Sequence, residues 1–177
     1  VVVEFRDHVV VIEAPLNEER SLAVIGEVNR LIPDKPIRFI VNTHHHWDHM
    51  GGIRAYVHEG ATVITHEGNH AYYQEVLRAG PWILQPDRFS LYPPEEWSEG
   101  YIFETARDKY VLADDTRTVE LYNVQGLAHA AGMLIAYFPR EQIVVQADLY
   151  NPRASAPNAS NRTFYQNLQR LNLDVTT

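Results

Sequence analysis

Apolar residues follow two patterns along this chain, short unbroken runs and helical spacing. Short runs rich in Val and Ile predict buried strands, whereas apolar residues on one helical face predict amphipathic helices. Strands are expected over residues 1–5, 9–13, 37–41, 61–65, 110–112, 118–124, 133–138 and 142–147. Helices are expected over residues 18–32, 53–58, 68–78 and 162–171. Asn17 is expected to cap the first helix. The alternation of strand and helix predicts an α/β (α+β layered) fold.

The periodicity is lost between Gly80 and Tyr101, where prolines are mixed with aromatic residues. A long aromatic segment in a compact domain is either a lid or contact surface, or a set of side chains packed over the edge of the core. Both interpretations are kept. Residues 151–161, rich in Pro, Ala, Asn and Ser, predict a further loop.

The most informative polar stretch, residues 42–52, follows the predicted strand 37–41. It holds four histidines and one aspartate between His44 and His49. Imidazole is the commonest protein ligand of divalent transition metals, and a carboxylate adds a hard oxygen. An expression tag would lie at a terminus, whereas this stretch is internal and follows a core strand. It therefore predicts a metal site at the end of a strand, where α/β proteins place their chemistry.

The spacing within the stretch suggests how the side chains are shared. In an extended segment alternate side chains point the same way, so His44, His46 and Asp48 are expected to share a face. His49 then turns to the other side as the chain enters a glycine pair. His44 and His46 can thus serve one metal ion while Asp48 and His49 serve a second. We interpret His45, which points away, as a packing or hydrogen-bonding residue.

The pattern His44-x-His46-x-Asp48-His49 resembles the signature of the metallo-β-lactamase superfamily of metal-dependent hydrolases. The resemblance implies an αββα sandwich, two sheets between helices, formed by a single domain over residues 1–177. Members normally have earlier strands and one last histidine ligand near the C-terminus. The fold is therefore expected to be incomplete at the N- and C-termini, with the second metal site one histidine short.

The resemblance also implies two ligands from later strands. A third histidine for the first metal ion matches His129, in a loop between two apolar runs, and a bridging carboxylate matches Asp148, which ends the next run. Many relatives have a Thr-Pro-Gly-like sequence after this histidine, where the chain has Ala130-Ala131-Gly132. The implied ligands are His44, His46 and His129 for the first ion, Asp48 and His49 for the second, and Asp148 between them. Asp48 is also the implied catalytic residue, which orients the nucleophilic water or moves a proton. The histidines without such context, expected not to bind metal, are His8, His58, His66 and His70.

Composition narrows the partners and the compartment. A hydrophobic content of 45% in 177 residues supports the core of one domain. No apolar run reaches the roughly eighteen residues of a membrane span, so we expect a soluble protein without a membrane partner, either cytoplasmic or exported. A net charge of −8, without a Lys/Arg cluster, argues against nucleic-acid binding. A small-molecule substrate is expected, and a homo-oligomer is left open.

The absence of cysteine excludes disulfides and thiolate sites, and histidine and aspartate ligands favour zinc, with iron or manganese as alternatives. The favoured function is hydrolysis of an ester, thioester, lactone or amide bond by a metal-bound hydroxide, with one or two zinc ions. A first alternative is a mononuclear iron enzyme that oxidises sulfur compounds, as some relatives do. A second is a non-catalytic or metal-deficient relative. β-Lactam hydrolysis is not preferred, because many relatives that perform it have cysteine where this chain has Asp148.

Overall fold

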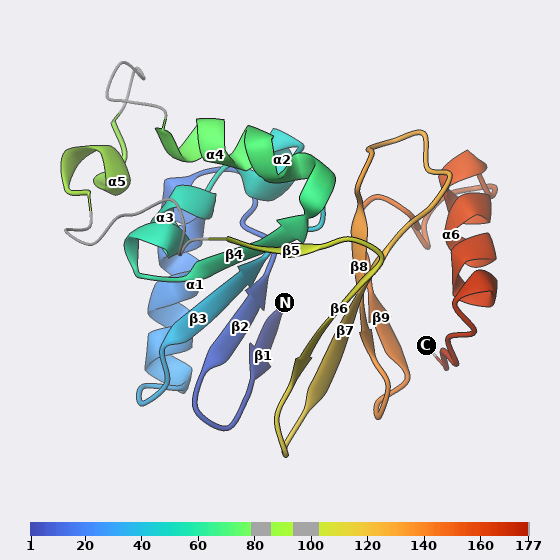
Figure 1. Ribbon diagram of the computed structural model, residues 1–177, viewed down its shortest axis with the longest axis horizontal. Helices are drawn as coiled ribbons and strands as arrows, with labels where there is room; N and C mark the ends of the chain where they lie inside the picture. Colours follow the sequence, from blue (N-terminus) through green and yellow to red (C-terminus); the bar gives the residue numbers. More distant parts are fainter. Residues whose placement is uncertain (79–85, 94–102, 177) are drawn as a thin grey trace.

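Two β-sheets face one another in this protein, and helices cover the outer side of each (Figure 1). The computed structural model describes residues 1–78, 86–93 and 103–176. The first sheet has the order β1-β2-β3-β4-β5, in which β1 and β2 are antiparallel and the later neighbours are parallel. Its strands are β1 Val2–Glu4, β2 Val9–Ile12, β3 Ile37–Val41, β4 Thr62–His66 and β5 Phe103–Ala106.

The second sheet has the order β6-β7-β8-β9 and is antiparallel throughout. Its strands are β6 Lys109–Ala113, β7 Thr118–Asn123, β8 Leu134–Phe138 and β9 Ile143–Val145. Leu121 of β7 pairs with Ala136 of β8, and both side chains face the first sheet in the core between the sheets.

Asparagine side chains cap the starts of two helices. The Asn17 side chain accepts a hydrogen bond from Arg20 N and starts α1, as expected, and Asn158 starts α6 in a reciprocal pair with Asn161. The helices are α1 Glu18–Leu31, α2 Trp47–Met50, α3 Ile53–His58, α4 His70–Arg78, α5 Arg88–Leu91 and α6 Ala159–Arg170, and a 3₁₀ turn, η1, spans Glu67–Asn69.

Three apolar layers hold these elements together. The first lies between the helices α1, α3 and α4 and the first sheet, and it includes Ile25. The second lies between the sheets, where Ile64 and Leu121 are fully buried. The third lies under α6, whose Phe164 and Leu168 pack against the second sheet. This order of helix, sheet, sheet and helix confirms the predicted αββα sandwich.

The histidine-rich stretch departs from its predicted conformation. The prediction of an extended segment through Asp48 was wrong, because residues 47–50 form the short helix α2. The two glycines after it lie close to the segment that starts α1. A Cβ at Gly51 would lie 2.2 Å from Leu16 O, and one at Gly52 would lie 2.1 Å from Ser21 Oγ. The stretch therefore packs against the start of α1 so closely that a side chain at either glycine has no room.

The structure describes only part of the segment over residues 80–101 that was predicted to be irregular. Residues 79–85 and 94–102 lie outside the described residues, so the lid interpretation stays a prediction. Between them α5 forms where a loop was expected, because Asp87 caps it by accepting a hydrogen bond from Ser90 N. The loop expected to run to residue 161 ends earlier, since α6 begins at Ala159. Within the described residues, every helix is too short or too polar to cross a membrane.

Candidate metal centre

Parallel pairing brings the histidine-rich stretch to one edge of the first sheet. Strand β3 lies between β2 and β4 and is parallel to both, so its carboxyl end opens at the same edge as theirs. The chain leaves β3 at Val41 and continues into residues 42–50, which we call the histidine loop. Leu134 N donates a 2.8 Å hydrogen bond to Thr43 O, which ties this loop to the start of β8 in the second sheet.

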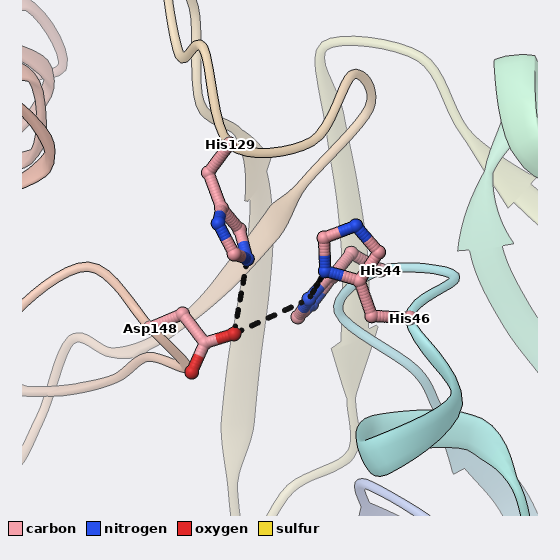
Figure 2. A group of neighbouring side chains, drawn as sticks. All are labelled: His44, His46, His129 and Asp148. Carbon is pink, nitrogen blue, oxygen red and sulfur yellow. Dashed lines mark hydrogen bonds and ion pairs between the residues drawn. The ribbon is translucent and has the colours of Figure 1, made fainter.

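Four side chains from the two sheets converge at this edge, as Figure 2 shows. One ligand atom from each of His44, His46, His129 and Asp148 lies within 4.8 Å of the others. Asp148 Oδ2 is 3.0 Å from His129 Nε2 and 3.4 Å from His44 Nε2. His44 Nε2 is 3.1 Å from His46 Nδ1. A group of nitrogen and carboxylate donors this close together suits a divalent metal ion.

His49 also reaches the Asp148 carboxylate. Its Nε2 is 3.0 Å from Asp148 Oδ2 and 3.6 Å from Asp48 Oδ2. The Asp148 oxygen therefore lies among imidazoles of both predicted ligand groups, which is the position that a bridging carboxylate requires. The structure groups four of the six predicted ligand residues and places His49 against Asp148 and Asp48 beside His49, and their binding of metal stays a proposal.

Two loops of the second sheet carry the later residues of the group. His129 lies between β7 and β8, in a loop where Gly132 adopts a φ of 67°. Asn69 Nδ2 donates to Gly132 O at 3.2 Å and holds this loop against the first sheet. Asp148 follows β9 with a φ of 61°, in the left-handed region that aspartate tolerates better than most residues.

Burial and hydrogen bonding set the charges of the cluster. Burial, with the neighbouring imidazoles of His49 and His46 adding to it, lowers the pKa of His44 to about 4. The His44 ring is therefore neutral at neutral pH and offers the lone pair that a metal ion requires. The hydrogen bond with Glu13 has the opposite effect on His49 and raises its pKa.

Glu13, directly after β2, is a functional candidate that the sequence prediction missed. Glu13 Oε2 lies 2.5 Å from His49 Nδ1, and Glu13 Oε1 accepts a 2.8 Å hydrogen bond from Thr43 N. A carboxylate on the second nitrogen of a metal-binding histidine fixes its tautomer and orients its ring. The signal that pointed to Asp148, an acid at the end of an apolar run, was also present at Glu13.

The other histidines lie outside the cluster that the described residues form. The ring of His45 lies 5.4 Å from that of Tyr72 between centroids, in keeping with a packing residue. His8 stacks on Phe5 in the core, with centroids 4.8 Å apart. His66 accepts a hydrogen bond from Gly68 N at the start of η1.

A cavity of about 590 Å³ opens beside the cluster. His129 and Asp148 line it and expose 32% and 35% of their side chains, so a small molecule can reach both groups. The remaining lining residues are Tyr150, Asn151, Pro152, Asn158 and Asn161. Trp47, next to His46 in the chain, is 67% exposed.

Several metallo-beta-lactamases are among the solved structures that superpose on this chain. A metallo-beta-lactamase from Pontibacter korlensis superposes with a TM-score of 0.71 at 18% identity, covering 98% of this chain and 74% of that one. DIM-1 metallo-beta-lactamase gives 0.68 at 13% identity, with 98% and 73% covered. Metallo-beta-lactamase IND-7 gives 0.70 at 10% identity, again with 98% and 73% covered. A comparison with curated protein sequences finds no match.

At such identities these superpositions show the fold, and the assignment to a family rests on the sequence itself. Residues 1–158 match the family model for the metallo-beta-lactamase superfamily. That range contains both sheets and every residue of the histidine and aspartate cluster. The chain belongs to the metallo-beta-lactamase superfamily.

Proposed function

We propose that this chain is a zinc-dependent hydrolase that cleaves an ester, thioester, lactone or amide bond of a small molecule. The placement of the Asp148 carboxylate carries the proposal. Asp148 Oδ2 lies between 3.0 and 3.4 Å from Nε2 of His44, His49 and His129, which come from both sheets. An aspartate with only a structural role has no need of this surrounding, whereas a carboxylate shared by two metal positions does.

The donor set fits zinc. The residues that would hold a first ion are His44, His46 and His129, and those that would hold a second are Asp48 and His49, with Asp148 shared. Nitrogen and carboxylate donors without sulfur suit zinc, and they also accept iron or manganese. The lowered pKa of His44 supports this assignment, because a ligand must be unprotonated to bind.

Zinc lowers the pKa of a coordinated water to about 7 and polarises carbonyl oxygens, which makes hydrolysis feasible at neutral pH. The chain itself supplies a base and orientation. The Asp48 side chain is 49% exposed and can accept a proton or orient the attacking water. Glu13 holds the His49 ring in place, and the cavity beside His129 admits the substrate.

Metal content and turnover, measured on the same preparation, test this function. We expect one or two zinc ions per chain by inductively coupled plasma mass spectrometry, and hydrolysis of at least one of a p-nitrophenyl ester, a thioester, a lactone and an amide. His46→Ala should abolish turnover, whereas His45→Ala, its neighbour outside the cluster, should retain it. One iron per chain with oxidation of a sulfur compound would support the mononuclear iron alternative instead. A chain without metal and without turnover would support a non-catalytic protein.

A further inference from the structure

The buried side chain of Asn42 connects the histidine loop to a helix that carries no ligand. Asn42 follows β3 directly and is fully buried. Its Nδ2 donates to His49 O at 2.9 Å and lies 3.4 Å from Glu13 Oε1. Its Oδ1 accepts a hydrogen bond from the hydroxyl of Tyr73, a fully buried residue of α4. Helices α4 and α2 lie at the same end of the first sheet (Figure 1).

These partners leave one orientation for the Asn42 amide. The carbonyl oxygen of His49 only accepts hydrogen bonds, so the amide nitrogen of Asn42 must face it. The amide oxygen then faces Tyr73, and the tyrosine hydroxyl must be the donor. Because the site is buried, an amide turned the other way would leave polar groups without partners. The acceptors His49 O and Glu13 Oε1 therefore set the orientation of the Asn42 amide, and the Tyr73 hydroxyl holds it there by donating to its oxygen.

The Asn42 amide in turn holds the backbone of His49. The His49 carbonyl accepts hydrogen bonds from Asn42 Nδ2 and, at 3.0 Å, from Ala14 N. The His49 ring is held separately, by Glu13 at Nδ1. Loss of the Tyr73 hydroxyl would weaken the hold of Asn42 on the backbone of His49 and leave the contacts with Ala14 N and with Glu13 in place. The role of Tyr73 is thus distinguishable from that of Glu13.

We propose that Tyr73 is a positioning residue of the metal centre. Its hydroxyl anchors Asn42, and Asn42 in turn holds the backbone of His49, whose ring faces Asp148. The inference rests on the metal centre proposed above, because the role assigned to Tyr73 is to keep His49 Nε2 directed at that centre. Outer partners of metal ligands alter metal affinity by about 10–100-fold, and Tyr73 acts through one residue more, so a loss of about 10-fold is expected.

The substitution Tyr73→Phe removes only the hydroxyl, and Tyr56→Phe is its matched control. Tyr56 is also fully buried in the layer between the helices and the first sheet, where its hydroxyl forms no hydrogen bond with the described residues. Two readouts compare them: ¹⁵N NMR signals of the His49 ring in the metal-free chain, and cobalt(II) affinity with its visible absorption spectrum. We expect Tyr73→Phe to shift or broaden the His49 signals, to weaken cobalt binding about 10-fold and to change the spectrum. Tyr56→Phe should retain the wild-type values of both.

Wild-type His49 signals together with wild-type cobalt affinity in Tyr73→Phe would overturn the inference. If the wild-type chain binds no cobalt, the proposed function fails, while the NMR comparison on metal-free protein still decides the role of Tyr73. If Tyr73→Phe does not fold, a measurement on the wild-type chain tests the role of Tyr73 instead. A slowly exchanging Tyr73 hydroxyl proton with a nuclear Overhauser effect to the Asn42 side-chain amide supports the inference, and a rapidly exchanging one overturns it.

Discussion

Glu13 Oε2 lies 2.5 Å from His49 Nδ1, so a carboxylate after β2 orients a histidine 36 residues later in the chain. The other oxygen of the same carboxylate accepts a hydrogen bond from Thr43 N at the start of the histidine loop. One side chain thus fixes both ends of the loop, and each of its oxygens must act as an acceptor.

Glu13→Gln tests this arrangement. A glutamine has one acceptor oxygen, so either the His49 ring or Thr43 N would face an amide nitrogen that cannot accept. We expect zinc affinity to fall by about 10–100-fold, measured by competition with a chromophoric chelator. The control is Glu4→Gln on β1, which removes an ion pair with Lys35. This variant should bind zinc like the wild type. Equal affinities of the two variants would refute the role of Glu13.

Asp148→Asn should cost more than Glu13→Gln, because Asp148 faces three imidazoles directly. The amide keeps the shape and removes the negative charge, so the loss should exceed the roughly 10–100-fold typical of an outer partner. Native mass spectrometry during a zinc titration measures both affinity and stoichiometry. Asp174→Asn, which alters a hydrogen bond with Gln142 outside the cluster, is the control. An unchanged zinc count and affinity in Asp148→Asn would remove the carboxylate from the proposed ligand set.

Gly132→Ala and Gly126→Ala separate backbone strain from steric contact near His129. Both glycines have positive φ, so either alanine should cost about 1–2 kcal/mol of stability. A Cβ at Gly132 would also lie 2.6 Å from His66 Nδ1, whereas a Cβ at Gly126 would meet nothing within 4 Å. We expect Gly132→Ala to be the less stable variant in thermal unfolding, since His66 must move. Equal losses would show that the His129 loop tolerates the contact.

The pair between Asp87 and Arg54 predicts a pH-dependent stability. Asp87 accepts hydrogen bonds from Arg54 Nε and Nη2 at 2.5 and 3.1 Å, and Arg54 is only 7% exposed. Burial alone would raise the pKa of Asp87, but hydrogen bonds from Arg54 and Ser90 outweigh it and hold this pKa below its ordinary value. A lowered carboxyl pKa stabilises the fold above the unfolded-state pKa, and this contribution is lost as the pH falls through the folded-state value.

Urea unfolding of the metal-free chain measures this contribution. Wild type should exceed Asp87→Asn by about 2 kcal/mol near neutral pH. The difference should shrink as the pH falls below about 4. Glu27→Gln, which breaks an exposed pair with Arg30, should matter little at any pH. A difference for Asp87→Asn that grows in acid would contradict the assignment.

Local patterns in the sequence predict much of the fold. Val and Ile runs predicted most strands, and Asn17 marked the start of α1, because these signals lie within a few residues of the element they determine. The pattern from His44 to His49 is equally local, so it indicated the candidate metal site directly. His129 and Asp148 carry weak signals by themselves and entered the prediction only through the resemblance to a family.

The features that the sequence did not predict depend on distant contacts. Strand β5 has no clear alternation and forms by pairing with β4, far away in the chain. The close approach of Gly51 to Leu16 joins residues that are 35 positions apart in the chain, so no local pattern indicates it. The pattern predicted the helix that contains Arg54 but not the burial of this charged side chain, because its burial depends on distant partners such as Asp87.

The candidate ligands come from both sheets, His44 and His46 from the first and His129 and Asp148 from the second. An ion bound by all four would act as a cross-link between two layers that otherwise meet through apolar contact and a few hydrogen bonds. Its binding would add to the free energy of unfolding, by about 2.7 kcal/mol at a free concentration one hundred times the dissociation constant. The concentration of free metal would then govern the stability of the folded chain, and its removal would make the chain easier to unfold and to digest.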